Sequence, residues 1–482
     1  TTADMTTSRA TTLNASGGTF ETVAGTTLAH GGVIAGAGAL TKAGAGTLTL
    51  TGDNSYTGPT TVANGTLAAG ATNSFSGASA YTVGASGTLA LQSFNQMIAS
   101  LNNQGSVRLA ANPTSTPGTV LTISGNYTGT GALFINTVLE GDNSPTDQFV
   151  VLGDTSGLTQ LQVNNVGGAG GQTIEGIKVI DVAGASIGQF SLIGDFITEN
   201  DEQAVVAGAY AYTLHQNGIA TPGDGDWYLR SQLVENEPGP RFNPGVPLYE
   251  SYPQILLDLN SLPTMQQRIG NRYWAGAGNT AEGQGDAGGP ERGPSFFEAT
   301  GIWGRIEASH SSYDPAVTSS DTSRDVNLYR LQSGIDFGLH EAADGSLLVA
   351  GLNLQYARAA ADVASPHGSG DIHTDGYGLG ASLTWLAASG FYLDAQAQLS
   401  FYDSNLSSTT ASQGLVSGND AIGYALSIEG GQRIDLGNGL TVTPQAQLSY
   451  SDVKFDSFHD AFGAAVRHDD GDSLRGRVGL SL

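Results

Sequence analysis

One tetrapeptide in this chain has the form of a catalytic nucleophile. Gly471-Asp472-Ser473-Leu474 spells a motif found in a class of esterases, in which a strand-to-helix turn exposes the serine and an Asp-x-x-His further along the chain supplies the base. Only eight residues follow Leu474, and their sequence, RGRVGLSL, alternates as a strand does. We therefore interpret the tetrapeptide as a chance match at the start of a strand. No Gly-Asp-Ser-Gly serine-protease motif occurs either, so the sequence predicts that this chain is not an enzyme.

Residues that could ligate a metal or hold a phosphate do not have the spacing that such sites require. Asp224 and Asp226 in PGDGDW could suggest calcium, but two carboxylates without further fixed ligands favour a polar turn. The glycines of GAGALTKAGAG, between Gly36 and Gly46, lack the Lys-Ser/Thr of a phosphate-binding loop and are interpreted as turn residues. We therefore expect no cofactor and no metal. The histidines are scattered without the spacing of zinc ligands, at His30, His215, His310, His340, His367, His373, His459 and His468.

The composition excludes several classes of function. The net charge is -26 and charged residues make up 13% of the chain, whereas a nucleic-acid surface needs stripes of Lys and Arg. The chain has no cysteine, which excludes disulfides and thiolate metal sites. No apolar run reaches the ~18 residues of a transmembrane helix. Because the chain begins with neither Met nor a signal segment, we expect a mature form or a fragment whose N-terminal part is missing.

The first 140 residues consist of short strand-like segments. Thr47-Leu48-Thr49-Leu50 and Gly87-Thr88-Leu89-Ala90-Leu91 put aliphatic residues on one face and threonine on the other, and Gly and Asn separate such segments. Strands this short make a stable sheet only when stacked, because each rung then buries the apolar face of its neighbour. The spacing of roughly 20 residues predicts a parallel β-helix over residues 1–140. The alternative is an unstructured Gly/Thr-rich linker, against which the regular alternation argues.

The middle of the chain changes in composition twice. Residues 141–235 have longer strands and aromatic residues such as Tyr212 and Trp227, and we expect them to close the end of the β-helix, because a solenoid needs a cap. Residues 236–294 are a linker that is proline-rich at its start and glycine-rich at its end. Within it, residues 251–274 keep near-helical apolar spacing, with a break or restart at Pro263.

From residue 295 onward the pattern is that of long alternating strands. In GFYLDAQAQLSFYDS and GLTVTPQAQLSY, apolar and polar residues alternate over about ten residues, with aromatic residues near the strand ends. This is typical of an outer-membrane β-barrel with apolar side chains toward lipid and polar ones toward the lumen; a soluble sandwich has shorter strands. We count about eight strands, near residues 298–312, 325–339, 346–360, 374–387, 390–404, 420–435, 438–453 and 472–482.

Several segments resemble the bacterial autotransporters (type V secretion). GALTKAGAGTLTLTGDNSYTGPTTVANGTL is similar to their passenger-associated repeat, and residues 141–235 resemble their autochaperone region. GIWGRIEAS, DGYGLGASLTW, GFYLDAQAQLSFYDS and GDSLRGRVGLSL resemble their β-domain, which would cover residues 295–482. The resemblance implies an all-β fold with a right-handed parallel β-helix, a helix threaded through the pore and a twelve-stranded barrel. Since about four strands would then be absent, we expect a truncated sequence or a broken gene, and a remnant that does not close properly.

The resemblance also implies a function. It predicts an outer-membrane translocator of a Gram-negative bacterium that displays its own passenger on the cell surface, with outer-membrane lipid, the barrel-assembly machinery and periplasmic chaperones as partners. Some members cut the chain within the pore helix, often at an Asn; Asn260 and Asn271 are the candidates, and an uncut helix is the alternative. The Thr/Asn-rich faces suit a passenger that adheres to host or neighbouring cells. The alternative is a protease or esterase passenger whose catalytic domain lies upstream of Thr1.

Alternation places a set of charged side chains on the polar face of the long strands. Charges that face a lumen around a threaded helix are expected to pair with one another or with the helix, so we assign them a structural role. They are Arg305, Glu307, Arg330, Asp336, Glu429, Arg433, Arg475 and Arg477.

Overall fold

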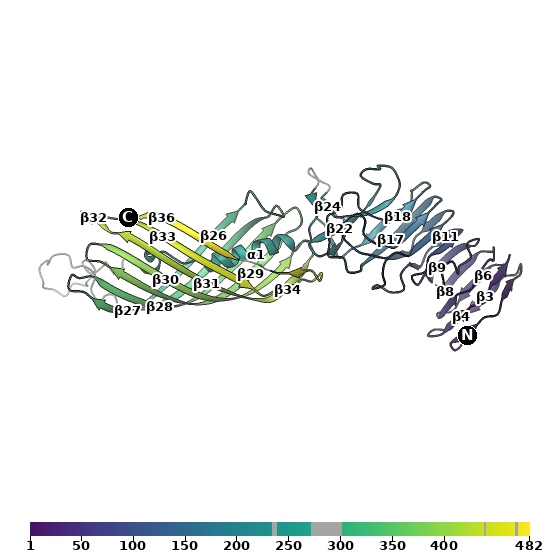
Figure 1. Cartoon of the computed structure of the whole chain (residues 1–482), viewed down its shortest axis with the longest axis horizontal. Helices are drawn as coiled ribbons and strands as arrows, with labels where there is room; N and C mark the ends of the chain where they lie inside the picture. The colour runs from purple at the N-terminus through teal and green to yellow at the C-terminus, as the bar shows by residue number, and fades with distance from the viewer. Residues whose placement is uncertain (234–238, 271–300, 438–439, 468–470) are drawn as a thin grey trace. The chain divides into compact units, whose positions relative to one another are not determined.

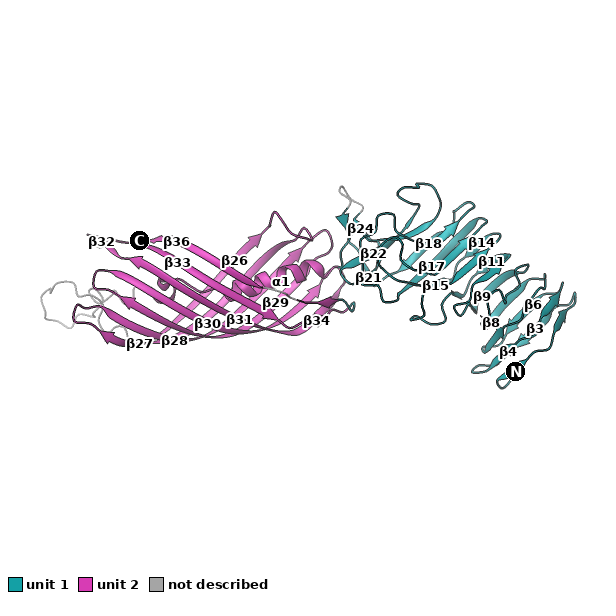
Figure 2. Cartoon of the chain, viewed as in Figure 1, with its two compact units in different colours: residues 1–243, 462–464 teal, residues 244–461, 465–482 magenta. Residues whose placement is uncertain are grey.

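The computed structural model describes residues 1–233, 239–270, 301–437, 440–467 and 471–482. These residues form two compact units, one of residues 1–243 with 462–464 and one of residues 244–461 with 465–482 (Figure 2). Strands dominate both units. Neither of the two helices described below is long and apolar enough to cross a membrane.

Unit 1 is a β-helix whose successive strands stack as parallel rungs (Figure 1). Its larger sheet comprises β1 (Met5–Thr7), β3 (Gly18–Glu21), β4 (Thr27–His30), β6 (Leu40–Ala43), β7 (Thr47–Leu50), β8 (Thr60–Ala69), β9 (Ala80–Ala90), β11 (Ser100–Asn103), β12 (Ser106–Arg108), β14 (Tyr127–Gly129), β15 (Ala132–Thr137), β17 (Thr155–Asn165) and β19 (Gln189–Ile193). A second sheet comprises β10 (Gln96–Ile98), β13 (Val120–Ile123), β16 (Gln148–Val151), β18 (Ile177–Val182), β20 (Phe196–Ile197), β21 (Gln203–Ala207), β22 (Tyr210–Gln216) and β23 (Trp227–Arg230). Two small pairs complete the unit, β2 (Thr11–Leu13) with β5 (Ile34–Gly36) and β24 (Gln232–Leu233) with β25 (Gly239–Pro240).

A column of aliphatic side chains runs through the core of the β-helix. Each member pairs in register with the next rung and is buried, so every rung covers the apolar face of its neighbour. The column is Leu28, Leu48, Leu67, Leu89, Val107, Leu133, Leu161 and Leu192. The expected β-helix is therefore confirmed.

The rungs do not keep the predicted length. Leu28 pairs with Leu48, about 20 residues on, but Leu133 pairs with Leu161 and Leu161 with Leu192, which makes the later rungs about 30 residues long. The extra residues lie in the connections at the corners, and lengthening a surface connection costs little free energy. The alternation of apolar and polar residues predicts the strands but not the lengths of the connections between them.

Buried amide side chains fasten the corners of neighbouring rungs. Asn54 accepts a hydrogen bond from the N–H of Ile34 (2.7 Å) and donates one to the carbonyl of Ser74 (2.6 Å). An unpaired buried N–H or C=O would cost about 1–3 kcal/mol, so each such side chain fixes the rungs on both sides. Gly36 ends β5 at φ +110°, where a Cβ would lie 2.2 Å from the carbonyl oxygen of Leu13, so this predicted turn glycine is instead the last residue of a strand that requires glycine.

The parallel stack ends in antiparallel strands. β18 pairs antiparallel with β23, and β22, β21 and β20 follow antiparallel in turn. The hydroxyl of Tyr212, fully buried, donates to the carbonyls of Glu140 (2.8 Å) and Gly171 (2.9 Å). Trp227 packs edge-on against Phe190 with 5.3 Å between ring centroids. This cap closes the core of the solenoid and shields its last parallel edge from further pairing.

Unit 2 is an antiparallel sheet curved into a half-barrel (Figure 1). Its long strands are β26 (Gly301–Tyr313), β27 (Ser323–Glu341), β28 (Leu347–Ala364), β29 (Gly370–Leu386), β30 (Phe391–Ser408), β31 (Gln413–Gln432), β33 (Leu440–Phe455) and β36 (Asp472–Ser481), and its short strands are β32 (Ile434–Gly437), β34 (Phe458–His459) and β35 (Ala465–Val466). β26 and β36 are the edges of the sheet as described. Most of the long strands exceed the expected ten residues, because the ladders continue past the apolar belt into polar pairs such as Asp375 with Asp403.

The side chains of these strands alternate as predicted, with apolar residues outward and polar residues inward. Leu393, Leu399 and Phe401 of β30 are exposed on the outer face, whereas Asp394 and Gln398 between them are buried. The order is the reverse of a water-soluble protein and fits a sheet bathed in lipid.

Two helices lie on the polar side of this sheet. α1 (Val246–Leu259) begins with a proline in its first turn and buries Leu248, Tyr252 and Ile255 against the strands. α2 (Met265–Ile269) starts with a capping box in which the Thr264 side chain accepts from the N–H of Gln267. The predicted break at Pro263 is present, but the helix starts earlier than residue 251, and residues 271–274 of the expected helix lie outside the described residues.

We expect acid to loosen the cap of the β-helix through His215. Burial lowers the pKa of this imidazole, an effect that the Glu202 carboxylate opposes and the Arg230 and Arg241 guanidiniums reinforce. A folded-state pKa below the unfolded value of about 6.5 means that stability is fully present above pH 6.5 and declines as the pH falls toward the lowered pKa. Hydrogen exchange of the β21–β22 peptides should therefore accelerate from pH 7 to pH 5.5, after correction for intrinsic exchange.

The control for this prediction is His215→Gln, which removes the titrating group. Exchange corrected in the same way should be independent of pH over this range in the variant. An equal acceleration in the variant would show that another group carries the effect.

Candidate functional site

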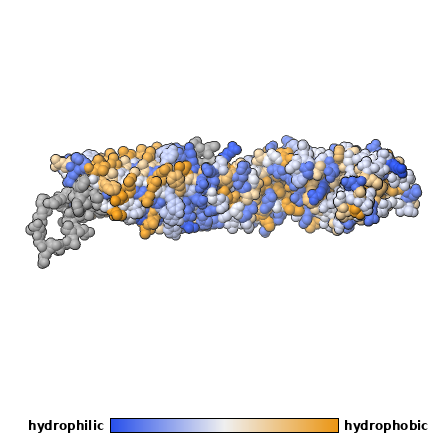
Figure 3. All heavy atoms as spheres, turned by 90° about the horizontal axis from the view of Figure 1, so that it is seen from below, coloured by the Kyte–Doolittle hydropathy of each residue, from blue (hydrophilic) through white to orange (hydrophobic). Residues whose placement is uncertain are grey.

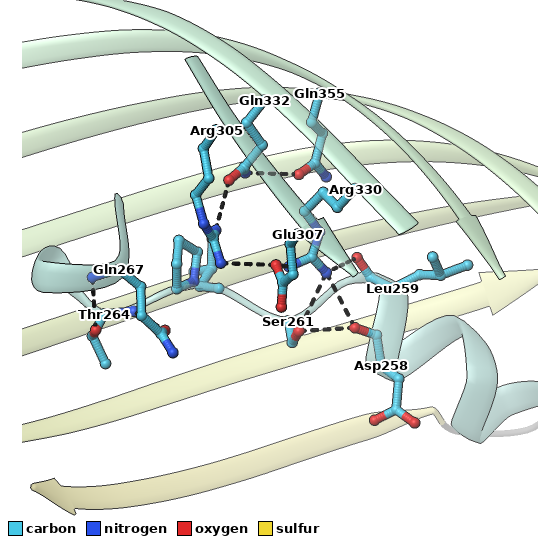
Figure 4. A network of polar contacts seen from close by, with 12 residues as sticks. Asp258, Leu259, Ser261, Thr264, Gln267, Arg305, Glu307, Arg330, Gln332 and Gln355 are labelled. Carbon is cyan, nitrogen blue, oxygen red and sulfur yellow. Dashed lines mark hydrogen bonds and ion pairs between the residues drawn. The ribbon is translucent and has the colours of Figure 1, made fainter. Parts of the chain in front are cut away.

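The most densely bonded part of unit 2 is residues 258–265, which join α1 to α2 on the polar side of the half-barrel and are called here the clamped segment. Arg330 of β27 holds its start. One guanidinium nitrogen donates to the carbonyl of Leu259 (2.9 Å) and to the hydroxyl of Ser261 (3.3 Å), and the other donates to Glu307 (3.0 Å) (Figure 4). The last carbonyls of a helix have no N–H partners within the helix, and the negative end of the helix dipole lies there. A buried guanidinium donates hydrogen bonds to these carbonyls and places a positive charge beside the dipole.

Asn260, the residue that ends α1, is fully buried and uses both ends of its amide. Its Nδ2 donates to the carbonyl of Tyr424 (3.0 Å) and to the hydroxyl of Ser451 (2.9 Å). Its Oδ1 accepts from Gln398 (3.3 Å) and Tyr402 (3.1 Å). One side chain thus ties the clamped segment to β30, β31 and β33.

A chain of amides connects these two anchors across the strands. Arg305 donates to Gln332 (2.9 Å), and Gln332 donates to Gln355 (3.0 Å), as Figure 4 shows. Gln355 and Gln398 both donate to the hydroxyl of Ser400 (3.2 and 3.1 Å), and Gln398 reaches Asn260. Such a network is rigid because almost every donor in it has an acceptor fixed by another strand.

The break at Pro263 leaves backbone groups that the strands satisfy. The carbonyl of Pro263 accepts from Gln396 (2.9 Å) and Gln447 (3.1 Å). The N–H of Met265, at the start of α2, donates to the carboxylate of Glu429 (3.0 Å). A carboxylate is the favoured partner of a helix start. Irregular backbone at membrane depth is tolerated only where protein supplies such partners.

A buried ion pair fixes α2. Arg268 donates to Asp394 (2.6 Å) and to the hydroxyl of Thr384 (3.2 Å), and its other terminal nitrogen lies 4.0 Å from Asp336. Trp303 of β26 donates its indole N–H to Asp336 (3.1 Å). All three charged side chains are at most 2% exposed, so one cation that the helix carries is shared by two buried carboxylates.

The other end of α1 contacts the connection between β26 and β27 and the strand β31. Glu250 accepts from the N–H of Ser319 (2.7 Å) and from the hydroxyl of Ser320 (2.6 Å). The hydroxyl of Tyr252 donates to Asn419 (3.1 Å). The segment from 246 to 269 is therefore held along its whole length.

The charges predicted for the lumen lie on this polar side with one difference. Arg305, Glu307, Arg330, Asp336 and Glu429 all belong to the networks above. Arg433 follows the end of β31, where its backbone N–H donates to Gly390 (2.8 Å), so strand alternation does not govern its direction.

Two further charges reach the clamped segment from β36. Arg477 donates to the carbonyl of Leu262 (3.4 Å), and Arg475 lies 4.0 Å from Asp258. Sequence reasoning did not single out Arg268 or Asp394. The only signal for Asp394 was its place on the polar face of its strand.

Of the two asparagines predicted as cleavage positions, only Asn260 lies in the described part of the chain. Asn260 is in the described part of the chain, and its amide makes the contacts given above. Asn271 lies outside the described residues. Cleavage at either asparagine stays a prediction.

The residues considered for catalysis and metal binding belong to a strand and a polar turn. Ser473 lies within β36, opposite Ser451 of β33, in a strand and not at a strand-to-helix turn. Asp224 accepts from the hydroxyls of Thr221 (2.6 Å) and Tyr228 (2.8 Å), as expected of a polar turn. Within the described ranges, no group of three or more His, Asp or Glu side chains is placed to hold a metal ion.

Three family matches cover most of the chain. Residues 302–482 match the family described as the autotransporter beta-domain, residues 96–214 the autochaperone domain type 1, and residues 40–69 the passenger-associated-transport-repeat. The autochaperone match starts before residue 141 and ends before residue 235, so its span differs from the predicted block.

Two relatives and one solved structure are similar to all or part of the chain. The whole chain is 45% identical to the adhesin BmaC autotransporter of Brucella suis biovar 1, of which it covers 14%, and 26% of it is 43% identical to the autotransporter adhesin AIDA-I of Escherichia coli, of which it covers 9%. The chain thus spans a small part of these relatives. The crystal structure of the beta domain of the Bordetella autotransporter BrkA is 27% identical, with a TM-score of 0.32, over 38% of this chain and 69% of that one.

Replacing Arg330 should weaken the half-barrel more than replacing an arginine on its outer face. Arg330→Gln removes the cation from the end of α1 and from Glu307. Breaking a buried, hydrogen-bonded charge pair costs about 3–5 kcal/mol, so we expect the temperature at which the folded form loses its gel mobility to fall by about 10 °C.

Arg358→Gln is the matched control. Its guanidinium is half exposed on β28 and lies 4.0 Å from Asp375. Exposed pairs contribute at most about 1 kcal/mol, so the same temperature should change by less than about 3 °C. Equal falls in the two variants would contradict the role given to the clamped segment.

Proposed function

This chain carries the C-terminal modules of the autotransporter family, and we propose that it anchors its β-helix to the outer membrane and displays it on the cell surface as an adhesive passenger. The proteins of this family lie in the outer membrane with their passengers at the surface. The observation that carries the proposal is the clamped segment, because it holds the half-barrel to the polypeptide that continues from the β-helix. We propose no catalytic role for this chain and infer that the barrel-assembly machinery inserts it.

The outer face of unit 2 supports insertion into lipid. Hydrophobic residues gather over its strands next to the grey segment in Figure 3, with hydrophilic surface beyond them. Outward side chains such as Leu352, Leu379 and Leu426 are more than half exposed, which would be unfavourable in water. The polar residues that would be unfavourable in lipid face the clamped segment instead.

The lengths of the connections support an orientation. At the end where α1 begins, residues 314–322 and 456–471 are long connections and residues 365–369 and 409–412 short ones; residues 342–346 and 387–390, at the other end, are both short. Outer-membrane barrels have short periplasmic turns and longer extracellular loops. We infer that α1 begins at the extracellular end, where Glu250 contacts Ser319, and that the β-helix leaves the barrel there.

The surface of the β-helix supports adhesion. A row of small hydroxyl side chains pairs in register across successive rungs, outside the column of buried leucines, and it carries no charge. At the usual strand spacing of about 4.8 Å, such a row is flat and presents a donor and an acceptor on every rung. The row is Thr27, Thr47, Thr66, Thr88 and Ser106.

Epitope accessibility on intact cells tests surface display. An epitope inserted after Ser115, in the exposed connection between β12 and β13, should bind antibody on intact cells. The same epitope inserted after Ala343, between β27 and β28, should bind only after permeabilisation, because that turn is placed in the periplasm. Exposure of both epitopes or of neither on intact cells would contradict the proposed orientation.

Charge placed on the hydroxyl row should reduce adhesion. The triple variant Thr47→Lys, Thr66→Lys, Thr88→Lys should lower adherence to cultured mammalian cells and cell–cell aggregation by about tenfold, which corresponds to a total loss of about 1.4 kcal/mol of binding free energy.

A matched triple variant adds the same charge to exposed positions away from the row, in the connection between β7 and β8. Thr51→Lys, Ser55→Lys, Thr57→Lys should leave adherence within about twofold of the parent. Equal losses in both triple variants, at equal surface abundance, would show that net charge and not the row is responsible.

A further inference from the structure

The outer face of the half-barrel is not uniformly convex. A groove of about 850 Å³ crosses β26 to β30. Its volume falls in the range of about 300–1,000 Å³ that is usual for sites that bind small molecules. Most of its lining is apolar, contributed by Ile302, Ile335, Leu352, Leu354, Leu379, Ala381, Ala397 and Leu399.

The groove exists because two alanines lie side by side in a surface of large side chains. Ala381 of β29 and Ala397 of β30 pair directly in the ladder. In the same row, Leu352 of β28 lies beside Ala381 and Leu426 of β31 lies beside Ala397, so bulky residues flank the alanine pair. Two residues along the strands, Leu379 and Leu399 also pair and form a wall.

The level of the groove places it within the hydrocarbon of the membrane. Along β29, Tyr377 follows Asp375, and Leu379 and Ala381 come next on the same outward face. The hydroxyl of Tyr356 donates to Asp375 (2.5 Å), so aromatic and carboxylate groups meet at that level. Tyrosines mark the membrane–water interface in barrels, and the groove begins beyond them.

These observations restrict the occupant. Water would find few partners among the apolar groove walls, and an empty groove would forfeit dispersion contacts on one side. The groove is continuous with the lipid-facing surface, which includes Leu383 and Leu426. An acyl chain is the group at this depth that is narrow enough to follow the surface between two rows of leucines.

We propose that the groove over Ala381 and Ala397 is a seat for one acyl chain of a membrane phospholipid. This inference rests on the proposed placement of the barrel in the membrane. Because hydrocarbon is the solvent on all sides, the preference arises from closer packing and not from the hydrophobic effect, and a modest preference over the rest of the outer face follows.

Photo-cross-linking from within the bilayer tests the proposal. The full chain is inserted into vesicles of palmitoyl-oleoyl-phosphatidylethanolamine and phosphatidylglycerol that contain phosphatidylcholine with a diazirine in one acyl chain. After irradiation, peptide mass spectrometry locates the adducts. We expect adducts on Leu352, Leu354 and Leu399 to exceed those on the lipid-facing Ile428 and Leu448, which do not line the groove, by about fivefold.

Two pairs of substitutions sharpen the test. Ala381→Leu with Ala397→Leu fills the groove and should reduce the excess to about onefold. Ala308→Leu with Ala446→Leu adds the same volume to exposed positions outside the groove and should leave the fivefold excess in place, within the scatter expected for distant sites. All forms must show heat-modifiable gel mobility, which reports the folded barrel.

The remaining outcomes are distinguishable. Uniform labelling over the whole outer face overturns the seat and leaves the membrane placement standing. Labelling of no outward leucine overturns the membrane placement itself. Cross-links between two copies of the chain at the groove residues would show that a second copy occupies the groove and would overturn its assignment to an acyl chain.

Discussion

Buried backbone that leaves a helix needs hydrogen-bond partners, and this requirement organises the half-barrel. The clamped segment interrupts the helical ladder at Pro263, which exposes carbonyls and an N–H at a depth where lipid could not satisfy them. Arg330, Gln396, Gln447 and Glu429 supply the partners. The strands therefore need polar side chains inside, and once the inside is polar the outside can be apolar throughout.

The same requirement explains why particular small residues occur in the strands. Gly423 of β31 faces Asn260, and a Cβ there would lie 2.9 Å from the Cγ of that side chain. Gly351 faces Asp336 in the same manner, with 2.4 Å to its Oδ1. These glycines are places where the strand must yield space to a buried polar group. In the β-helix, buried backbone groups at the corners also need hydrogen-bond partners. Side chains such as Asn54 supply them to backbone groups of two neighbouring rungs.

Periodicity in the sequence was sufficient to predict both architectures. Alternation in Thr47-Leu48-Thr49-Leu50 indicated a rung, and alternation over Gly390–Ser404 indicated a long strand with a polar side, because each pattern is local. The partners of Asn260 were not predictable, since they come from three strands more than 130 residues away and depend on registers that no local pattern encodes. The direction of the Arg433 side chain was not predictable for a different reason: this residue follows the end of β31, and alternation holds only within a strand.

Cross-linking of paired cysteines measures the central claim most directly, since the chain has no cysteine of its own. The side chains of Asn260 and Ser451 are in hydrogen-bond contact (2.9 Å), so a short bifunctional thiol reagent should join Asn260→Cys to Ser451→Cys in the folded, outer-membrane form, seen as a mobility shift of the heat-modifiable band. Asn260→Cys with Leu448→Cys, whose second position is half exposed on the outer face of the same strand, should not be joined. A cross-link in the second pair, or in neither, would contradict a helix end held on the polar side of the half-barrel at Asn260.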